Sequence, residues 1–217
     1  MNDKLVRRLS WGAGLTLGLL PMSALAASIV ANGSFEDGLS NIGKFTTITS
    51  GLTNWTISSG NVDYIGSYWL ASNGSRSLDL NGSSIPTPTV SQAVSLTGGQ
   101  QYLLSFDMAG NPDGGPLTKS LTVAVGTALP SQSVTFDSTG KTTTAMGWIT
   151  KSFLFTAPST GSYALSFKSD VTDPCCYGPA LDNVSISAVP EAETYAMMLA
   201  GLGLVGIATR RRTRAIA

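Results

Sequence analysis

The sequence predicts an all-β fold, an antiparallel jelly-roll β-sandwich that lies between two helical targeting segments. No stretch between residues 27 and 189 has a convincing 3.6-residue apolar period. Short runs that alternate apolar and polar residues recur there instead, and clusters of Gly, Asn, Pro and Ser separate them. About ten short strands with turn signals between them are typical of such a sandwich, and a stretch of about 160 residues suits one domain.

The alternating runs define the expected strands in chain order. The clearest runs from Tyr102 to Met108, where apolar residues occupy every second position and Ser105 and Asp107 lie on the other face. Asn-Gly pairs such as Asn73-Gly74 supply turns between runs. The expected strands are residues 28–30, 45–48, 55–57, 62–65, 77–80, 90–94, 102–108, 121–125, 134–136, 149–155, 163–167 and 181–186.

Residues 1–26 are typical of a secretory signal peptide. Three basic residues lie in the first eight positions, an apolar run covers residues 9–20, and Ala24-Leu25-Ala26 supplies small residues for cleavage after Ala26. An uncleaved anchor helix is the alternative. Either interpretation predicts export of the domain formed by residues 27–189.

Residues 190–217 combine a short acidic turn, an apolar run and an arginine cluster. The uncharged run of about residues 194–209 would span about 24 Å as a helix, against about 30 Å for a bilayer core. We expect a transmembrane helix whose cluster, Arg210, Arg211 and Arg212, lies on the cytoplasmic side. A buried core helix followed by a basic tail is the alternative.

The order of these blocks resembles the PEP-CTERM sorting tail of Gram-negative bacteria. Pro190 and Glu191 match its Pro-Glu-Pro start, whereas Ala192 stands in place of the second proline. The resemblance implies insertion in the inner membrane with the domain outside. It further implies cleavage by an exosortase near the Pro-Glu site and delivery to the cell surface or extracellular matrix.

Composition excludes several classes of function. The domain of residues 27–189 has six basic and ten acidic residues, a net charge of −4, so nucleic acid is not an expected partner. The sequence has no histidine, which excludes Ser-His-Asp triads and His-ligated zinc, although oxygen-ligated calcium remains possible. Cys175 and Cys176 are adjacent, and both a strained vicinal disulfide and two free thiols stay open.

Motifs at both ends of the domain resemble the choice-of-anchor C and DUF642 group. They are Asn32-Gly33-Ser34-Phe35-Glu36 at the start and Gly178-Pro179-Ala180-Leu181-Asp182-Asn183-Val184-Ser185 at the end. Members of this group are exported, galactose-binding-like jelly rolls related to carbohydrate-binding modules. The resemblance implies that the first and last strands run side by side. It also implies a structural Ca²⁺ site there, with Glu36 and Asp182 as acidic ligands, unless these side chains cap turns or face solvent.

Two loops carry the residue types that bind sugars. Aromatic faces stack on sugar rings, while carboxylates and amides bind hydroxyl groups. One loop is rich in aromatic residues and lies near Arg76, and the other follows a strand. The candidate carbohydrate-binding residues are Trp69, Tyr68, Tyr64, Asp63, Asn111 and Asp113. The alternative is that the aromatic residues, with Trp55, fill the core of the sandwich.

Catalysis is not expected from this sequence. It contains no nucleophile elbow, metal triad or phosphate loop. Asp63 and Asp79 could in principle act as a glycosidase pair, but Asp79 lies within an apolar strand and is expected to bind turn amides. The sequence thus predicts an exported, non-catalytic protein that binds extracellular polysaccharide in the exopolysaccharide matrix or envelope. A structural or adhesive matrix protein without a sugar site is the alternative.

Overall fold

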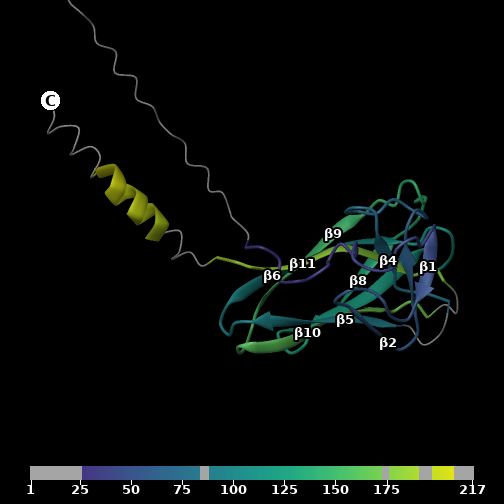
Figure 1. The fold of residues 1–217 in the computed structure, drawn as a ribbon, viewed down its shortest axis with the longest axis horizontal. Coiled ribbons are helices and arrows are strands. Elements are labelled where there is room, and N and C mark those ends of the chain that lie inside the picture. Colours follow the sequence, from purple (N-terminus) through teal and green to yellow (C-terminus); the bar gives the residue numbers. More distant parts are fainter. Residues whose placement is uncertain (1–25, 84–87, 173–175, 191–196, 208–217) are drawn as a thin grey trace, which may run out of the picture.

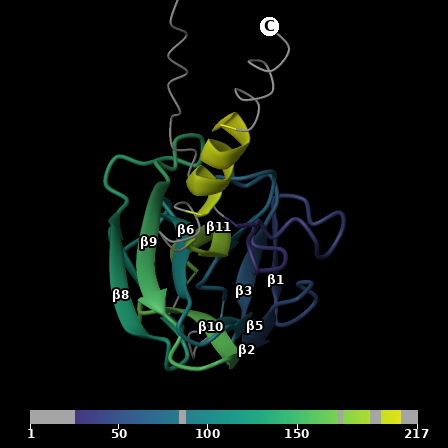
Figure 2. The same cartoon turned by 90° about the vertical axis from the view of Figure 1, so that its left-hand side faces the viewer.

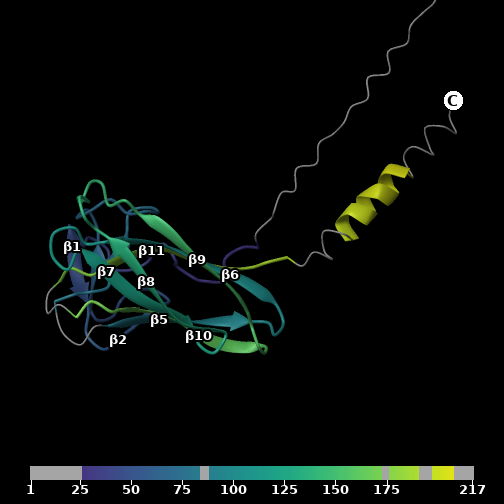
Figure 3. The ribbon, with the colours of Figure 1, turned by 180° about the vertical axis from the view of Figure 1, so that it is seen from behind.

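The computed structural model describes residues 26–83, 88–172, 176–190 and 197–207. Within these residues, eleven β-strands form two antiparallel sheets that lie face to face (Figure 1). Figures 2 and 3 show the same two layers end-on and from behind. The predicted all-β sandwich is therefore confirmed.

The two sheets divide the strands without regard to chain order. The six-stranded sheet has the order β1-β3-β4-β11-β6-β9, and its strands are β1 (Phe45–Ile48), β3 (Val62–Ile65), β4 (Ser77–Asp79), β11 (Pro179–Ala188), β6 (Gln101–Gly110) and β9 (Ile149–Thr156). The five-stranded sheet has the order β2-β5-β10-β7-β8, and its strands are β2 (Thr56–Ser58), β5 (Thr89–Leu96), β10 (Gly161–Ser169), β7 (Thr118–Val125) and β8 (Leu129–Asp137).

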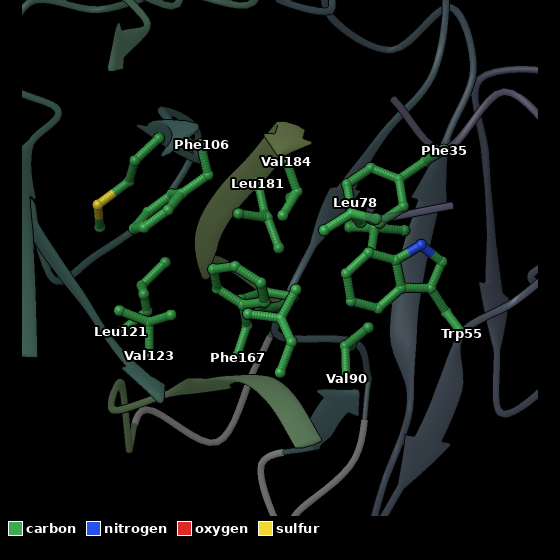
Figure 4. Close-up of a cluster of buried hydrophobic side chains, with 14 of the residues drawn as sticks. Phe35, Trp55, Leu78, Val90, Phe106, Leu121, Val123, Phe167, Leu181 and Val184 are labelled. Carbon is green, nitrogen blue, oxygen red and sulfur yellow. The ribbon is translucent and has the colours of Figure 1, made fainter. Parts of the chain in front are cut away.

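The core lies between the sheets and is built by the alternating residues. On β6, Tyr102, Leu104, Phe106 and Met108 are all buried, as their spacing predicts. Figure 4 shows the centre of this core, where side chains from both sheets meet. The labelled residues are Phe35, Trp55, Leu78, Val90, Phe106, Leu121, Val123, Phe167, Leu181 and Val184.

Trp55 is a core residue. This agrees with the alternative interpretation, in which the aromatic residues fill the core rather than bind sugar. Its ring centroid lies 5.3 Å from that of Phe35 and 6.3 Å from that of Phe167. Its indole Nε1 donates a hydrogen bond of 2.9 Å to the carbonyl oxygen of Asn32. The N-terminal segment is therefore fixed to the core by a side chain that also fills it.

The segment of residues 28–30 does not form the expected strand, although it lies beside the last strand as the family resemblance implies. The amide of Ile29 donates to the carbonyl of Ile186 at 2.9 Å, and the amide of Val184 donates to the carbonyl of Gly33 at 2.8 Å. A regular ladder ends here because Asn32 has a φ of 51° and Phe35 a φ of 58°, values that turn the chain. The first described residues and the end of β11 consequently lie at the same end of the sandwich (Figure 1).

Strand β8 is longer than predicted. It extends over Leu129–Asp137, whereas the apolar pattern marks only residues 134–136. Because β8 is an edge strand with mostly exposed side chains, little of it needs to be apolar.

Residues 197–207 are helical and their side chains are exposed. This segment is part of the apolar run for which a transmembrane helix is predicted, and both ends of that run lie outside the described residues. Among the helices of the described residues, none has the length and apolar character needed to cross a bilayer. The signal peptide and the arginine cluster also lie outside the described residues.

Candidate functional site

The face of the six-stranded sheet that points away from the core carries an unusual set of side chains. Leu78 on β4 faces the core, so its neighbours Ser77 and Asp79 point to the opposite side. We call that side the outer face, and pairing across the strands assigns to it Asp63, Ile65, Ser77, Asp79, Asp107, Ala109, Ala180 and Asp182. All eight are buried. Since an open sheet face would leave carboxylates in solvent, loops must cover this face.

One cover is the segment of residues 66–76, which we call the covering loop. Trp69 in this loop is 3% exposed, and its Nε1 donates a hydrogen bond of 2.8 Å to the hydroxyl oxygen of Ser77 on β4. Trp148 Nε1 donates to the carbonyl of Leu70 at 2.9 Å and so holds the loop from the other side. Trp69 thus seals the outer face and is inaccessible to stacking on a sugar.

Two carboxylates anchor the end of the covering loop. Asp182 accepts hydrogen bonds of 2.8 Å from the amides of Ser72 and Asn73. Glu36 accepts hydrogen bonds from the amides of Ser75 and Arg76, at 2.7 and 2.8 Å. Charged acceptors of this kind form stronger hydrogen bonds than neutral ones. The end motifs of the domain therefore meet at the covering loop.

These contacts bear on the predicted calcium site. The four amides occupy one oxygen of each carboxylate, Oε1 of Glu36 and Oδ2 of Asp182, so a calcium ion would share these side chains with the N–H donors of the covering loop. Within the described residues, no three or more Asp, Glu, Cys or His side chains are grouped to hold a metal. Calcium binding by Glu36 and Asp182 stays a prediction.

A pocket of about 230 Å³ opens on the outer face beside β3 and β4. We call it the Asp63 pocket. Its lining combines aromatic rings with carboxylate, amide and carbonyl groups. The lining residues are Phe45, Asp63, Ile65, Tyr68, Asp79, Asn111, Cys176 and Tyr177. Its size is below the about 300–1,000 Å³ of pockets for drug-sized ligands, so it suits one sugar ring.

The two carboxylates of this pocket are cross-strand partners with different surroundings. Asp63 accepts a hydrogen bond of 2.6 Å from Thr47 Oγ1, and burial raises its pKa. Asp79 has no exposed surface, and burial raises its pKa to about 8. Its oxygens accept hydrogen bonds from the side chain of Asn111 and the amides of Asn81 and Gly178, at 2.8, 2.9 and 3.0 Å. The expectation that Asp79 binds turn amides is confirmed.

Tyr68 and Asn111 connect the covering loop to the loop after β6. The hydroxyl of Tyr68 donates to the carboxylate of Asp113, and this bond raises the pKa of Tyr68 to about 12. Asn111 Oδ1 accepts a hydrogen bond of 3.1 Å from the amide of Asp113. Tyr68 therefore presents its ring to the pocket while its hydroxyl is fixed by Asp113.

The structure brings together some of the predicted sugar-binding residues but not all of them. Asp63, Tyr68 and Asn111 line the pocket, and Asp113 holds Tyr68. Tyr64 lies in the core, where it has no exposed surface and donates a hydrogen bond of 2.6 Å to the carbonyl of Phe35. Strand alternation could have indicated this, because Tyr64 and Asp63 are neighbours on one strand and must face opposite sides.

Phe45 and Tyr177 are pocket residues that sequence reasoning missed. Phe45 is 45% exposed at the start of β1, and its ring meets that of Tyr68 edge-on at 5.4 Å between centroids. Tyr177 is half-buried and packs over Gly114, where an added Cβ would lie 2.1 Å from its ring. An aromatic residue in the Gly- and Pro-containing turn after the cysteines is the signal that could have found Tyr177.

The cysteine pair lies next to the pocket. Cys176 lines it, takes part in a disulfide, and accepts a hydrogen bond of 3.2 Å from Asn111 Nδ2 at its carbonyl. Cys175, the other cysteine of the sequence, lies outside the described residues.

Comparison with known families identifies the domain. A family model described as "Protein of unknown function (DUF642)" matches residues 28–187. The chain belongs to the DUF642 family. A second model, the PEP-CTERM protein-sorting motif, matches residues 188–212 of this DUF642 protein, which indicates export and sorting to the cell envelope. Both resemblances seen in the sequence are thus confirmed.

One curated relative and two solved structures extend the comparison. Halomucin of Haloquadratum walsbyi is 31% identical over 172 residues, which is 76% of this chain. The DUF642 chain spans only 2% of the length of Halomucin.

The structure of TmCBM61 in complex with β-1,4-galactotriose matches with a TM-score of 0.52 and 16% identity, over 74% of this chain and 98% of TmCBM61. The CBM22-1 xylan-binding domain of Paenibacillus barcinonensis Xyn10C has a TM-score of 0.47 and 19% identity, over 78% and 99% of the two chains. The match to TmCBM61 shows the fold that the DUF642 domain shares with a carbohydrate-binding module.

Proposed function

We propose that this DUF642 protein is an exported, non-catalytic protein that binds carbohydrate in the exopolysaccharide matrix or envelope. The observation that carries the proposal is the Asp63 pocket, where three partly exposed aromatic rings surround a carboxylate and an amide. The shared fold with TmCBM61, which was solved with β-1,4-galactotriose, supports it.

The chemistry of the pocket suits a sugar. The rings of Phe45, Tyr68 and Tyr177 offer apolar faces on which the C–H faces of a pyranose can stack. Asp63 accepts only one hydrogen bond from the described residues, so it has acceptor capacity for sugar hydroxyls. Apolar faces beside a few fixed polar groups are the usual composition of a site that selects a small polar ligand.

The carboxylate pair supports binding rather than glycoside hydrolysis. A hydrolase needs one carboxylic acid and one carboxylate that both reach the glycosidic bond. Asp79 has no exposed surface and its oxygens already accept three hydrogen bonds. It is therefore fixed as a structural acceptor that keeps Asn111 in place.

The sorting tail supplies the destination in this proposal. An exosortase cleaves near Pro190-Glu191 after the segment of about residues 194–209 has held the precursor in the inner membrane with the domain outside. The PEP-CTERM match supports this order of events. Cleavage would release the domain to the cell surface or matrix, where its partner is an extracellular polysaccharide.

A structural or adhesive matrix protein without a sugar site is the second candidate. The burial of Trp69 and Tyr64 favours it, because two of the three aromatic side chains that were predicted to bind sugar serve the fold instead. In that case the outer face would be a packed surface and the Asp63 pocket would hold only solvent.

A glycan array with the wild-type protein and two variants separates the candidates. We expect Tyr177→Ala to lose a stacking face and Asp63→Asn a charged acceptor, each weakening sugar affinity about tenfold or more, the equivalent of about 1.4 kcal/mol. Asp137→Asn, an exposed change of the same charge on β8, is the matched control and should bind as the wild type does. If the wild-type protein binds no glycan on the array, carbohydrate binding is rejected and the structural role is favoured.

A further inference from the structure

A second pocket lies beside the aromatic pair Tyr68 and Trp69. It measures about 500 Å³ and shares no lining residue with the Asp63 pocket. Tyr68 lines one pocket and Trp69 the other, and their ring centroids are 5.7 Å apart. We call the second one the Arg76 pocket. The two pockets therefore adjoin the same pair of tilted rings, with one ring in the lining of each.

The Arg76 pocket contains a positively charged side chain, that of Arg76. Arg76 is the one arginine between residues 27 and 189, and it is half-buried. Its guanidinium lies over the ring of Tyr64, 5.8 Å from the centroid, while its backbone amide donates to Glu36. Among the hydrogen bonds and ion pairs of the described residues, none engages the guanidinium.

Glycines keep space around this guanidinium. A Cβ on Gly66 would lie 2.8 Å from Arg76 Nη1 and 2.2 Å from the carbonyl oxygen of Gly43, so no other residue fits there without displacement. Glu36, which lies beside Gly74 at the pocket edge, directs its oxygens to the amides and the hydroxyl of the covering loop. A partly desolvated fork of N–H donors is thus left facing the pocket.

We infer that the Arg76 pocket binds an anionic substituent of the polysaccharide, a uronate carboxylate or a sulfate ester. The planar guanidinium pairs with either oxyanion through two parallel hydrogen bonds. The side-chain amide of Asn41 lies in the same lining and can donate to a remaining oxygen, whereas the hydroxyls of Ser67 and Ser75 already donate to the Gly43 carbonyl and to Glu36. The inference rests on the proposed carbohydrate binding, and it makes the ligand an acidic polysaccharide that reaches both pockets.

Isothermal titration of the full chain with three probes tests the inference. The probes are trigalacturonate, its fully methyl-esterified form and a sulfated galactotriose. The wild-type protein should bind an anionic probe at least about tenfold more tightly than the neutral ester, with an affinity that falls as NaCl is raised. The two anionic probes distinguish carboxylate from sulfate as the preferred group.

Substitutions of Arg76 give the second part of the test. Arg76→Gln should remove the preference for the anionic probe, and Arg76→Lys should restore only part of it because an ammonium lacks the fork. Lys168→Gln, the same charge change on the exposed side of β10, should bind as the wild type does. Unchanged melting temperatures would show that each variant is folded.

The outcomes separate this inference from the proposed function. If neither anionic probe binds more tightly than the neutral ester, or if Arg76→Gln keeps the preference, the inference on the Arg76 pocket is overturned while neutral sugar binding stays intact. Failure of the wild-type protein to bind either anionic probe would overturn it as well. Weaker binding of all three probes by Asp63→Asn, with the preference for the anionic probe retained, would support both.

Discussion

Asp79 and Asp137 show how position sets the state of one residue type. Asp79 lies on the outer face without exposed surface, and burial raises its pKa from the ordinary 3.8 to about 8. Asp137 is exposed at the end of β8, and hydrogen bonds from the hydroxyl and amide of Thr139 lower its pKa. The folded protein therefore holds a proton on Asp79 at pH values where the unfolded chain has released it.

This difference makes stability fall with rising pH. Between about pH 4 and pH 8 the folded state binds more protons than the unfolded state, so the free energy of unfolding should decrease by about 2–4 kcal/mol. Asp79→Asn, which has no proton to release, should show a smaller decrease. Urea unfolding at pH 5 and pH 8 measures both values.

Asp137→Asn is the control for this prediction. Its lowered pKa places its titration below the tested window, so it should lose as much stability as the wild type between pH 5 and pH 8. An Asp79→Asn variant with the same pH dependence as the wild type would contradict the assignment.

At the scale of elements, the covering loop decides what the outer face can do. Amides of its residues 72–76 donate hydrogen bonds to Asp182 on β11 and to Glu36 in the N-terminal segment. Burial raises the pKa of Asp182 to about 7. Trp69 at the middle of the loop closes the face, and Tyr68 beside it faces the Asp63 pocket. One loop therefore builds a wall of both pockets.

The calcium hypothesis is tested on this element. If Glu36 and Asp182 hold a structural calcium ion, EDTA should lower the melting temperature by several degrees, because removal of a ligand bound only by the folded state destabilises it. Added CaCl₂ should restore the value. Asp182→Asn should be insensitive to both reagents.

An unchanged melting temperature of the wild-type protein in EDTA would end the calcium hypothesis. The donors of residues 72–76, together with the amide of Asn183, would then be the partners that hold these two carboxylates.

For the whole molecule, the arrangement of the chain ends suits a protein that is first anchored and then released. The first described residues run beside β11, the last strand, so the two points at which the targeting segments join the domain lie at one end of the sandwich (Figure 1). The Asp63 pocket lies beside the start of β11, where Cys176 and Tyr177 precede the strand, whereas the sorting tail follows the end of β11. Anchoring and binding can therefore occur together.

The sorting tail provides the prediction at this scale. Replacement of Arg210, Arg211 and Arg212 by Gln should abolish processing, because the cluster that fixes orientation at the membrane is lost. Cell fractionation with mass analysis of the C-terminus of the product measures this.

Arg214→Gln is the matched control, because Arg214 lies just beyond the matched motif of residues 188–212 and its loss should leave sorting intact. Normal delivery of the triple variant to the surface would show that the cluster is dispensable.

The sequence alone determined the all-β class, the family and the sorting tail. These follow from local patterns: alternation along a strand such as β6, Asn-Gly turns, and contiguous motifs at both ends of the domain. It also placed Asp63, Tyr68 and Asn111 among the candidate site residues, because their types carry the chemistry wherever they lie.

Only the tertiary structure decided which aromatic residues are accessible and which groups share a pocket. Trp69 and Tyr68 are neighbours in sequence, yet the Trp69 side chain is buried against β4 and the Tyr68 side chain lines the Asp63 pocket. Asp79, Asn111 and Tyr177 come from three distant segments that meet because β4 and β6 both pair with β11. Such pairing depends on long-range strand order, which local alternation does not encode, because each strand fits any partner with a matching apolar face.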